Sequence, residues 1–440
     1  MTRVFVHSPS EAPDAPVVVT RMPDFERLGE RALLLARPGD VVCLAHPVEP
    51  GYLEFLGSLS IGPRAEDVLV IPGVVPGTGL SQRLCADADS LDRLASRLIG
   101  FGPILVSPFF ATPAADALSR ALGERLARPA GLLGGPPALV RRLHEKRVTR
   151  RLARRLGIPI APGEVVRISG SPAPSSSDLS ALRAAIQRRS SETGRAIVRG
   201  SSGASGSSTF TADARGIEAS LEAIAGRTDN RAYVVEPLYE AAASPNVEVI
   251  VEEGALRAAA TDQLLDGALA YQGSVHPSGA RRLPEMLASA RALAAWMRGG
   301  GFAGRAGFDF VERTGQSLPG YFLTEINPRI NGASYPLALL GRLARRAERL
   351  GVPTPAAFRT RSVASSARDF DDLARLSGGL LYDPARGEGV VPWSVAALEF
   401  GKVGIASFAA SPERAEEIFA DFASRAEAFD PSPGPTPVRA

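Results

Sequence analysis

Hydrophobic positions along the first 135 residues alternate between two patterns. Apolar runs predict strands at RVFVHS, PVVVT, GDVVCLA, DVLVIPG and GPILVSPFF. Apolar positions recur at helical spacing in DFERLGERALLLA, SLDRLASRLIG and PAADALSRALGERLA. Strands that alternate with helices are typical of a mostly parallel sheet. The pattern therefore predicts an α/β domain over residues 1–135.

The pattern changes in the remaining residues. PPALVRRLHEKRVTRRLARRLGIPIAP begins with prolines and ends at Gly157 and Pro159, which predicts one helix. AIVRGSSGASGSSTF predicts two strands around a loop of small residues, and NVEVIVEEGALRAAATDQLL predicts antiparallel strands around Glu253 and Gly254. GGLLYDP, GVVPWSVAALEF and KVGIASFAA predict strands before a helix near 412–427.

Composition narrows the class of protein. A chain of 440 residues with 45% hydrophobic residues predicts two or three domains with true cores. No apolar run approaches the ~18 residues of a membrane span, and the first residues lack a signal-peptide pattern. Cys43 and Cys85 are the two cysteines, which favours a reducing cytoplasm. The basic run at 141–155 lacks interleaved aromatic residues, which disfavours nucleic-acid binding.

Acidic and amide side chains gather in two neighbouring predicted strands. Asp309 lies in GFDFV, and Glu325 and Asn327 end the strand YFLTEINPR. Residues two apart on a strand point to the same face, so pairing of the two strands would bring these three side chains together. Such a set of oxygens suits Mg²⁺, with Arg329 beside the phosphates. The alternative is an exposed hairpin that carries ordinary charges.

Other residues suit a nucleotide. Backbone N–H groups of the glycine loop can donate to phosphate oxygens, and Arg199 and Lys146 add positive charge. Glu236 can accept from an adenine amino group, and Glu248 can bind ribose hydroxyls. GGGFAG at 299–304 follows a predicted helix and precedes a strand, which excludes a dinucleotide fingerprint there.

The order of these features over about residues 140–340 resembles the ATP-grasp superfamily of carboxylate–amine ligases. Its most specific parts are TEINPRINGASYP and HEKRVTRRLARRLGIPIAP. With the tail GGLLYDPARGEGVVPW, the layout looks like peptide ligases of the pheganomycin type. The resemblance implies a pre-ATP-grasp α/β domain at 1–135 and an α+β ATP-grasp core with antiparallel sheets at 136–350, whose small lobe is about 160–235. Residues 351–440 would complete the substrate side and end in a flexible tail.

The resemblance also implies a role for each candidate residue. The α- and β-phosphates would contact Lys146 and Arg199, a position where the family usually has lysine. The triphosphate would be covered by Gly203, Ala204, Ser205 and Gly206. Adenine would contact Glu236, Pro237 and Leu238, and ribose would contact Glu248. One or two Mg²⁺ ions would bind Asp309, Glu325 and Asn327. The catalytic arginines would be Arg329, at the transferred phosphoryl group, and Arg305.

The implied activity is ATP-dependent amide or peptide bond formation through an acyl phosphate, in secondary metabolism. Its substrates would be a small-molecule carboxylate and an amine or peptide, with no membrane or nucleic-acid partner. One alternative is loading of an amino acid onto a carrier-protein thiol, and another is a non-catalytic ATP-binding protein. The oligomeric state stays open, with the homodimer as the commonest assembly of such chains.

Overall fold

The computed structural model describes residues 1–13, 24–71, 78–171, 173–203, 208–213, 215–252, 254–315 and 320–430. The predicted strand PVVVT, the turn residue Glu253 and the predicted flexible tail beyond residue 430 lie outside the described residues. So do residues 204–207 of the glycine loop, among them the predicted site residues Ala204, Ser205 and Gly206.

The N-terminal region forms a five-stranded parallel sheet, which confirms the predicted parallel pairing, although its strand Ala130–Leu132 was not among the predicted ones. Its strand order is β3-β2-β1-β4-β5. The strands are β1 (Thr2–Val6), β2 (Val41–Leu44), β3 (Val68–Val70), β4 (Ile104–Pro108) and β5 (Ala130–Leu132). The connecting helices are η1 (Pro9–Glu11), η2 (Phe25–Leu34), α2 (Pro50–Ser58), η3 (Ala65–Asp67), α3 (Leu80–Ala86), α4 (Ala88–Leu98) and α5 (Pro113–Arg125). The predicted helix DFERLGERALLLA is 3₁₀ helix over its η2 segment.

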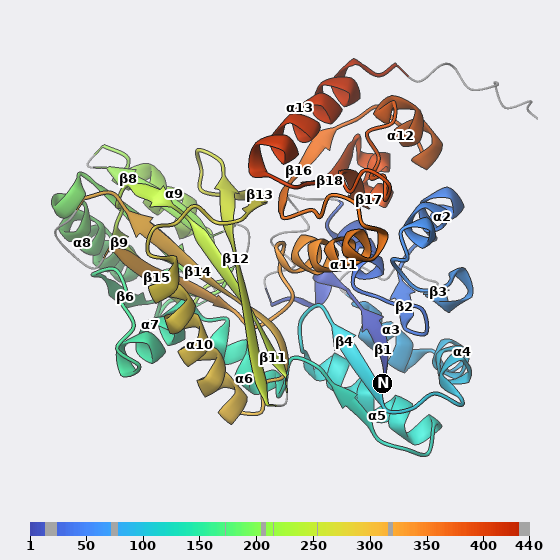
Figure 1. The fold of residues 1–440 in the computed structure, drawn as a ribbon. Helices are drawn as coiled ribbons and strands as arrows, with labels where there is room; N and C mark the ends of the chain where they lie inside the picture. The colour runs from blue at the N-terminus through green and yellow to red at the C-terminus, as the bar shows by residue number, and fades with distance from the viewer. Residues whose placement is uncertain are drawn as a thin grey trace, which may run out of the picture.

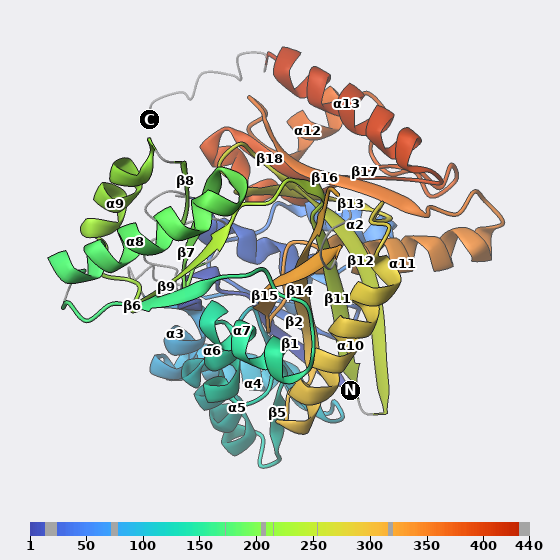
Figure 2. The same cartoon turned by 90° about the vertical axis from the view of Figure 1, so that its left-hand side faces the viewer.

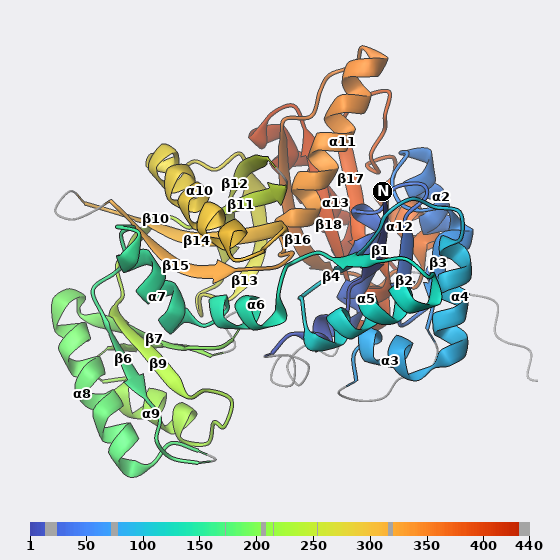
Figure 3. The same ribbon diagram turned by 90° about the horizontal axis from the view of Figure 1, so that it is seen from below.

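A smaller antiparallel sheet follows, in the order β6-β9-β7-β8. Its strands are β6 (Glu164–Arg167), β7 (Arg195–Gly200), β8 (Thr209–Asp213) and β9 (Ala232–Pro237), and its helices are α8 (Ser176–Thr193) and α9 (Ile217–Ala225). Figure 3 shows this lobe set apart from the rest, with α7 (Lys146–Arg155) between it and β15 (Tyr321–Asn327). Helix α7 therefore connects this lobe to β15.

A nine-stranded antiparallel sheet joins the middle of the chain to its C-terminal part. Its main order is β10-β14-β11-β12-β13-β16-β18-β17, and β15 pairs with β14. The other strands are β10 (Ala241–Ala243), β11 (Pro245–Glu252), β12 (Ala255–Leu265), β13 (Tyr271–His276), β14 (Gly304–Arg313), β16 (Ala357–Ala364), β17 (Gly389–Ser394) and β18 (Lys402–Ala409). Its helices are α10 (Leu283–Gly299), α11 (Ser334–Leu350), α12 (Phe370–Ser377), η4 (Val395–Phe400) and α13 (Pro412–Ala428).

Helices cover the large sheet, and one hydrophobic core connects the N-terminal region to the C-terminal region. Helix α10 lies along β11 and β12, and α13 covers β16 and β18 (Figure 2). Helix α11 lies between the C-terminal elements and the N-terminal sheet (Figure 1). One apolar core runs from Phe5 and Tyr52 of the N-terminal region to Trp393 and Phe422 near the C-terminus. No helix among the described residues is long and apolar enough to cross a membrane.

Three sequence predictions are wrong in detail. The predicted basic helix is two helices, α6 (Pro137–Leu143) and α7, because Glu145 has an extended backbone and the N–H of Lys146 donates to the carbonyl of Ser201 at 2.8 Å. GGLLYDP is not a strand, because only isolated bridges form there, from Leu381 and Asp383 to the next segment. GVVPWSVAALEF is a strand only over β17, and its last six residues form the 3₁₀ helix η4. The first difference matters because it places Lys146 at the beginning of a helix beside the glycine loop.

His7 follows β1 and connects the N-terminal sheet to α11. It is 1% exposed, and its Nδ1 lies 3.1 Å from the hydroxyl of Tyr335. Its ring packs edge-on against the rings of Phe5, Phe109 and Tyr335. Burial and the nearby charge of Arg31 lower the pKa of His7 from 6.5 to about 3. The folded chain therefore holds this imidazole neutral.

A His7→Gln variant should lose part of the acid sensitivity of the wild-type protein. The unfolded chain takes up a proton at His7 below pH 6.5 and the folded chain does not, so this stability is lost as the pH falls from 6.5 towards 3. Urea unfolding at pH 7.5 and 5.5 should show a loss about 1.4 kcal/mol smaller in the variant. Equal losses in the two proteins would contradict the role assigned to His7.

Candidate functional site

The pairing of β14 with β15 brings two carboxylates face to face. Asp309 lies directly opposite Glu325, and Gly307 lies opposite Asn327. Because Glu325 and Asn327 are two residues apart, both share the face of the sheet that Asp309 occupies. The predicted pairing of these two strands is therefore confirmed, and the three side chains lie together.

Asp309 is bracketed by two amides. Nδ2 of Asn327 donates to its Oδ2 at 2.8 Å, and Nδ2 of Asn246, opposite it on β11, donates to its Oδ1 at 2.6 Å. Desolvation and the adjacent charge of Glu325 raise the pKa of Asp309 to about 6, against the effect of these hydrogen bonds. Two close carboxylates are thus an unfavourable arrangement that a cation would relieve.

Lys146 supplies the protein cation nearest to Glu325. Its Nζ lies 3.1 Å from Oε1 of Glu325 and donates to the carbonyl of Gly203 at 3.0 Å. Burial opposes ionisation of Glu325, but the charges of Lys146, His144 and Arg199 outweigh it and lower the pKa of this carboxyl. Lys146 therefore connects β15 to the entrance of the glycine loop.

Glu236 lies between two arginines. Its carboxylate accepts from Arg150 of α7 and from Arg199 of β7. Arg150 also donates to the carbonyls of Ala161 and Gly163, both at 3.1 Å, and Arg199 donates to the carbonyl of Thr324 at 3.1 Å. The structure therefore places Glu236, predicted for adenine, directly against Arg199, predicted for phosphate.

Leu238 also has a protein partner. Its N–H donates to the carbonyl of Arg195 at 2.9 Å, while Pro237 has no N–H to offer. The backbone N–H of Leu238, a residue predicted to contact adenine, is thus engaged with the small sheet.

A cavity of about 590 Å³ opens between the sheets. It is lined by ten of the predicted site residues, namely Lys146, Arg199, Gly203, Glu236, Pro237, Leu238, Asp309, Glu325, Asn327 and Arg329. Glu248 and Arg305 are not among the described residues that line it. They form an ion pair with each other, and Ser334 donates to Glu248.

Arg329 reaches the cavity from the segment after β15. Its guanidinium lies over the ring of Phe109, 5.1 Å from the centroid, and donates to the carbonyl of Ile330 at 3.0 Å. Its Nε is buried without a hydrogen-bond partner among the described residues. The stacking aligns a charge that is available beside the two carboxylates.

Asn246 and Arg150 are the site residues that sequence reasoning missed. Asn246 lies two residues before Glu248 on the same face of β11, so strand alternation alone does not choose between them. Arg150 lies in a run of arginines, and only its small exposed fraction, 4%, separates it from the solvent-facing ones. Its spacing of four residues from Lys146 places both side chains on one face of α7, and this is the sequence signal that could have found Arg150.

The oxygen set fits a hard divalent cation. Among the described residues no three His, Cys, Asp or Glu side chains gather as a metal cluster, so the set has two carboxylates and depends on amides. Asp309, Glu325 and Asn327 provide the types of oxygen that Mg²⁺ prefers, and it usually completes its shell with water and phosphate oxygens. The buried Oδ1 of Asn246, without a partner in the described structure, adds another polar atom here.

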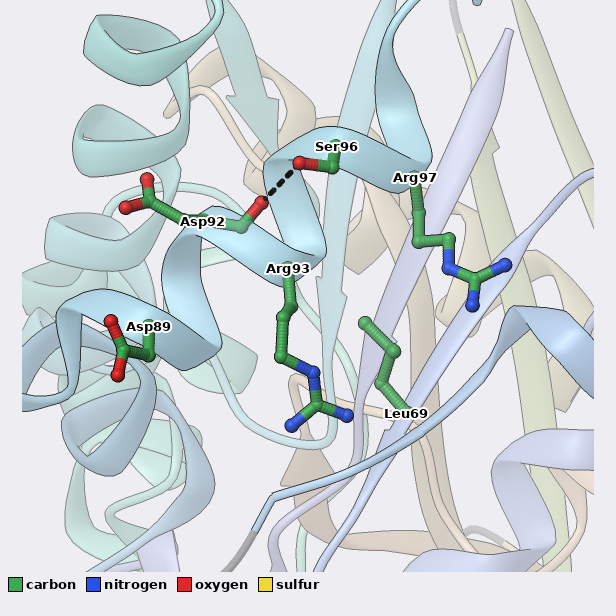
Figure 4. Close-up of a pocket in the computed structure, with 6 residues that line it drawn as sticks. All are labelled: Leu69, Asp89, Asp92, Arg93, Ser96 and Arg97. Carbon is green, nitrogen blue, oxygen red and sulfur yellow. Dashed lines mark hydrogen bonds between the residues drawn. The ribbon is translucent and has the colours of Figure 1, made fainter.

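A second hollow, on the N-terminal region, has a different character. It is lined by Leu69 and by exposed residues of α4, namely Asp89, Asp92, Arg93, Ser96 and Arg97. Figure 4 shows the two aspartates directed away from the two arginines, and the hydroxyl of Ser96 donates to the backbone of its own helix. These charges form a solvated helix face.

Comparisons with known proteins support the architecture. Residues 29–124 match the family model of the Pre ATP-grasp domain, and residues 373–420 match that of the PGM1 C-terminal domain. N5-carboxyaminoimidazole synthase from Aspergillus clavatus, solved with ADP, is 12% identical with a TM-score of 0.53, over 97% of this chain and 99% of that one. The chain has an ATP-grasp fold.

Further solved structures share this ATP-grasp fold. Biotin carboxylase from Campylobacter jejuni is 13% identical with a TM-score of 0.54, over 94% of this chain and 88% of that one. N5-carboxyaminoimidazole synthetase from Staphylococcus aureus, complexed with ADP, is 10% identical with a TM-score of 0.53, over 96% of each chain. No curated protein sequence matches the chain. The likeness thus concerns the ATP-grasp architecture and not a close relative.

The cluster of Glu236, Arg150 and Arg199 should be sensitive to loss of its carboxylate. Glu236→Ala would leave two buried guanidinium groups unpaired, which should lower the free energy of unfolding by about 3–5 kcal/mol. Glu164→Ala is a matched control, because Glu164 also pairs with two arginines but is more exposed. Its loss should be about 1 kcal/mol or less in the same urea titration. Similar losses in the two variants would contradict the buried cluster as the stabilising feature.

Proposed function

We propose that the protein is an ATP-dependent ligase that activates a carboxylate as an acyl phosphate and joins it to an amine. The observation that carries this proposal is the group formed by buried Lys146 and the partly buried Asp309 and Glu325 in the cavity of an ATP-grasp fold. Paired carboxylates beside a lysine suit a metal-bound triphosphate, because the carboxylates can hold the metal ion and the lysine can attract the phosphates.

The reaction can be written from the chemistry of its substrates. An oxygen of the donor carboxylate bonds to the γ-phosphorus of ATP, and the bond from that phosphorus to the β-phosphate oxygen breaks, which releases ADP. The acceptor amine then bonds to the acyl carbon, inorganic phosphate leaves, and the amine loses a proton to solvent. Mg²⁺, when bound, would neutralise charge that develops on the phosphate oxygens.

The residues of the chain would position the reactants rather than react themselves. Asp309, Glu325 and Asn327 would hold Mg²⁺, and Lys146 would attract the phosphates after exchanging its contact with Glu325 for them. Arg329 would stabilise the transferred phosphoryl group. The glycine-loop residues Ala204, Ser205 and Gly206 stay assigned to a cover that excludes water from the acyl phosphate.

The narrower form of the proposal is peptide bond formation in secondary metabolism. It rests on the resemblance of the tail sequence to peptide ligases of the pheganomycin type, and the PGM1 C-terminal domain model matches part of this region. An ADP-release screen over amino acids and short peptides, alone and in pairs, tests it. Addition of a phosphopantetheinylated carrier protein separates amine acceptors from a carrier thiol.

Glu325→Gln should lower ADP release at least about a hundredfold, because it removes one metal carboxylate and unpairs Lys146. Removal of divalent cations with EDTA should abolish ADP release in the wild-type protein, and added Mg²⁺ should restore it. Glu252→Gln is the matched control, since Glu252 forms an exposed ion pair with Arg257 at the far end of β11. Circular dichroism checks that both variants fold. A wild-type rate in Glu325→Gln would refute the proposed metal site.

A further inference from the structure

Arg31 of η2 projects an almost fully buried positive charge towards the cavity. The residue is 8% exposed and lines the same cavity as Asp309 and Glu325. Its guanidinium lies 4.7 Å from the ring centroid of Tyr335 and 5.7 Å from that of Trp393. Its Nε donates to the carbonyl of Leu28 at 3.0 Å. Two rings and a backbone carbonyl therefore align its planar fork.

No carboxylate of the described residues pairs with Arg31. The acidic residues nearest to it along η2 have other partners: Asp24 pairs with Lys402 at 2.8 Å, Glu26 accepts from Ser8 and Ser10, and Glu30 accepts from the N–H of Ala396. A buried charge without a partner destabilises the folded protein. An anion bound to the Nη1 and Nη2 atoms of this guanidinium would remove that penalty. The cavity is where that anion would enter.

Arg31 lies on a different wall from the metal cluster. Asp309 and Glu325 come from β14 and β15, whereas Arg31 comes from the N-terminal region and Trp393, its neighbour, from β17. Tyr271 of β13 lines the same cavity as Arg31 and Asp309, and its hydroxyl lies 2.9 Å from that of Ser274. A molecule bound in the cavity can therefore contact both ends.

We propose that Arg31 binds the unreacted carboxylate of the acceptor, so that the acceptor is an α-amino acid or a peptide with a free carboxylate. This inference rests on the proposed ligase activity. The donor carboxylate must lie at the transferred phosphoryl group, where Arg329 already provides a cation. A second guanidinium, contributed by η2 and without an acidic partner among the described residues, fits a carboxylate that survives the reaction and directs the amine towards the acyl carbon.

The surrounding side chains suit such an acceptor. Phe25, Leu28 and Ala333 line the cavity near η2 and the start of α11, and they offer an apolar surface for its side chain. Asp24 is neutralised by Lys402, so it does not compete for Arg31. An amide or ester in place of the carboxylate would lose the charge-assisted, two-pronged hydrogen bond with the guanidinium.

Tryptophan fluorescence provides a direct test that needs no turnover. The chain has two tryptophans, and Trp296→Phe leaves only Trp393, which lies beside Arg31. This variant is titrated with free amino acids and dipeptides, with their carboxamides, and with inorganic phosphate, in the presence of Mg²⁺ and a non-hydrolysable ATP analogue. At least one free acid should bind about ten- to a hundredfold more tightly than its amide.

Substitutions at two neighbouring arginines sharpen the result. Arg31→Gln should abolish the preference for the acid and leave amide binding unchanged, while Arg31→Lys should restore part of the preference. Arg27→Gln is the matched control, because Arg27 lies one turn earlier on η2 and pairs with Glu399 outside the cavity lining. This control should keep the wild-type preference.

The outcomes separate this inference from the proposed function. The Arg31 proposal is overturned if no free acid binds more tightly than its amide. It is also overturned if inorganic phosphate changes the fluorescence of Trp393 and none of the free acids does. For a reactive pair from the ADP-release screen, Arg31→Gln should raise the acceptor KM about tenfold or more with little change in the ATP KM. ADP release that is equal for acids and amides overturns the Arg31 proposal while the ligase activity stands. Absence of ATP binding overturns the proposed function instead.

Discussion

Two acidic side chains face each other across β14 and β15, and the rest of the site is arranged around their repulsion. Asp309 and Glu325 are opposite partners in the strand register, in surroundings that desolvate them. Like charges so placed cannot both remain ionised without cations nearby. Lys146 pairs directly with Glu325, whereas Asp309 has two amide donors and the charge of Arg329 without an ion pair among the described residues. The imbalance leaves room for one more positive charge, which is the electrostatic basis for a metal-bound nucleotide here.

Lys146 also explains why the basic segment is interrupted. If 137–155 were one continuous helix, the N–H of Lys146 would bond within that helix instead of to Ser201. The interruption begins a new helix at Lys146, and this lets its backbone hold the strand that enters the glycine loop while its side chain reaches Glu325. One residue thereby couples the small sheet to the large one. A ligand that draws Lys146 from Glu325 would act on both lobes at once.

The sequence predicted the strands and helices well where their pattern is local. The parallel N-terminal sheet, the glycine-loop hairpin and the pairing of Asp309 with Glu325 follow from alternation and turn residues. Ion-pair and hydrogen-bond partners from distant segments could not be predicted, because they depend on how separate helices and sheets pack against each other. Glu236 suited adenine in isolation, yet two arginines from different elements occupy its carboxylate. Glu248 and Asn246 share a strand face, and only the packing of Ser334 and Arg305 against Glu248 separates them.

The cations around the cavity differ in how far their charge is already compensated, and this difference indicates where ligands bind. The guanidinium of Arg199 pairs with Glu236 and donates to the carbonyl of Thr324. Its first role is therefore to stabilise the interface between the two sheets. A lysine has no planar fork to satisfy two such acceptors, which gives a structural reason for arginine at this position. Arg31 is equally buried but stacked on aromatic rings with no acid beside it in the described structure. Arginines that are paired with acidic residues stabilise the walls of the cavity, whereas an arginine without an acidic partner can bind an anionic group of a substrate.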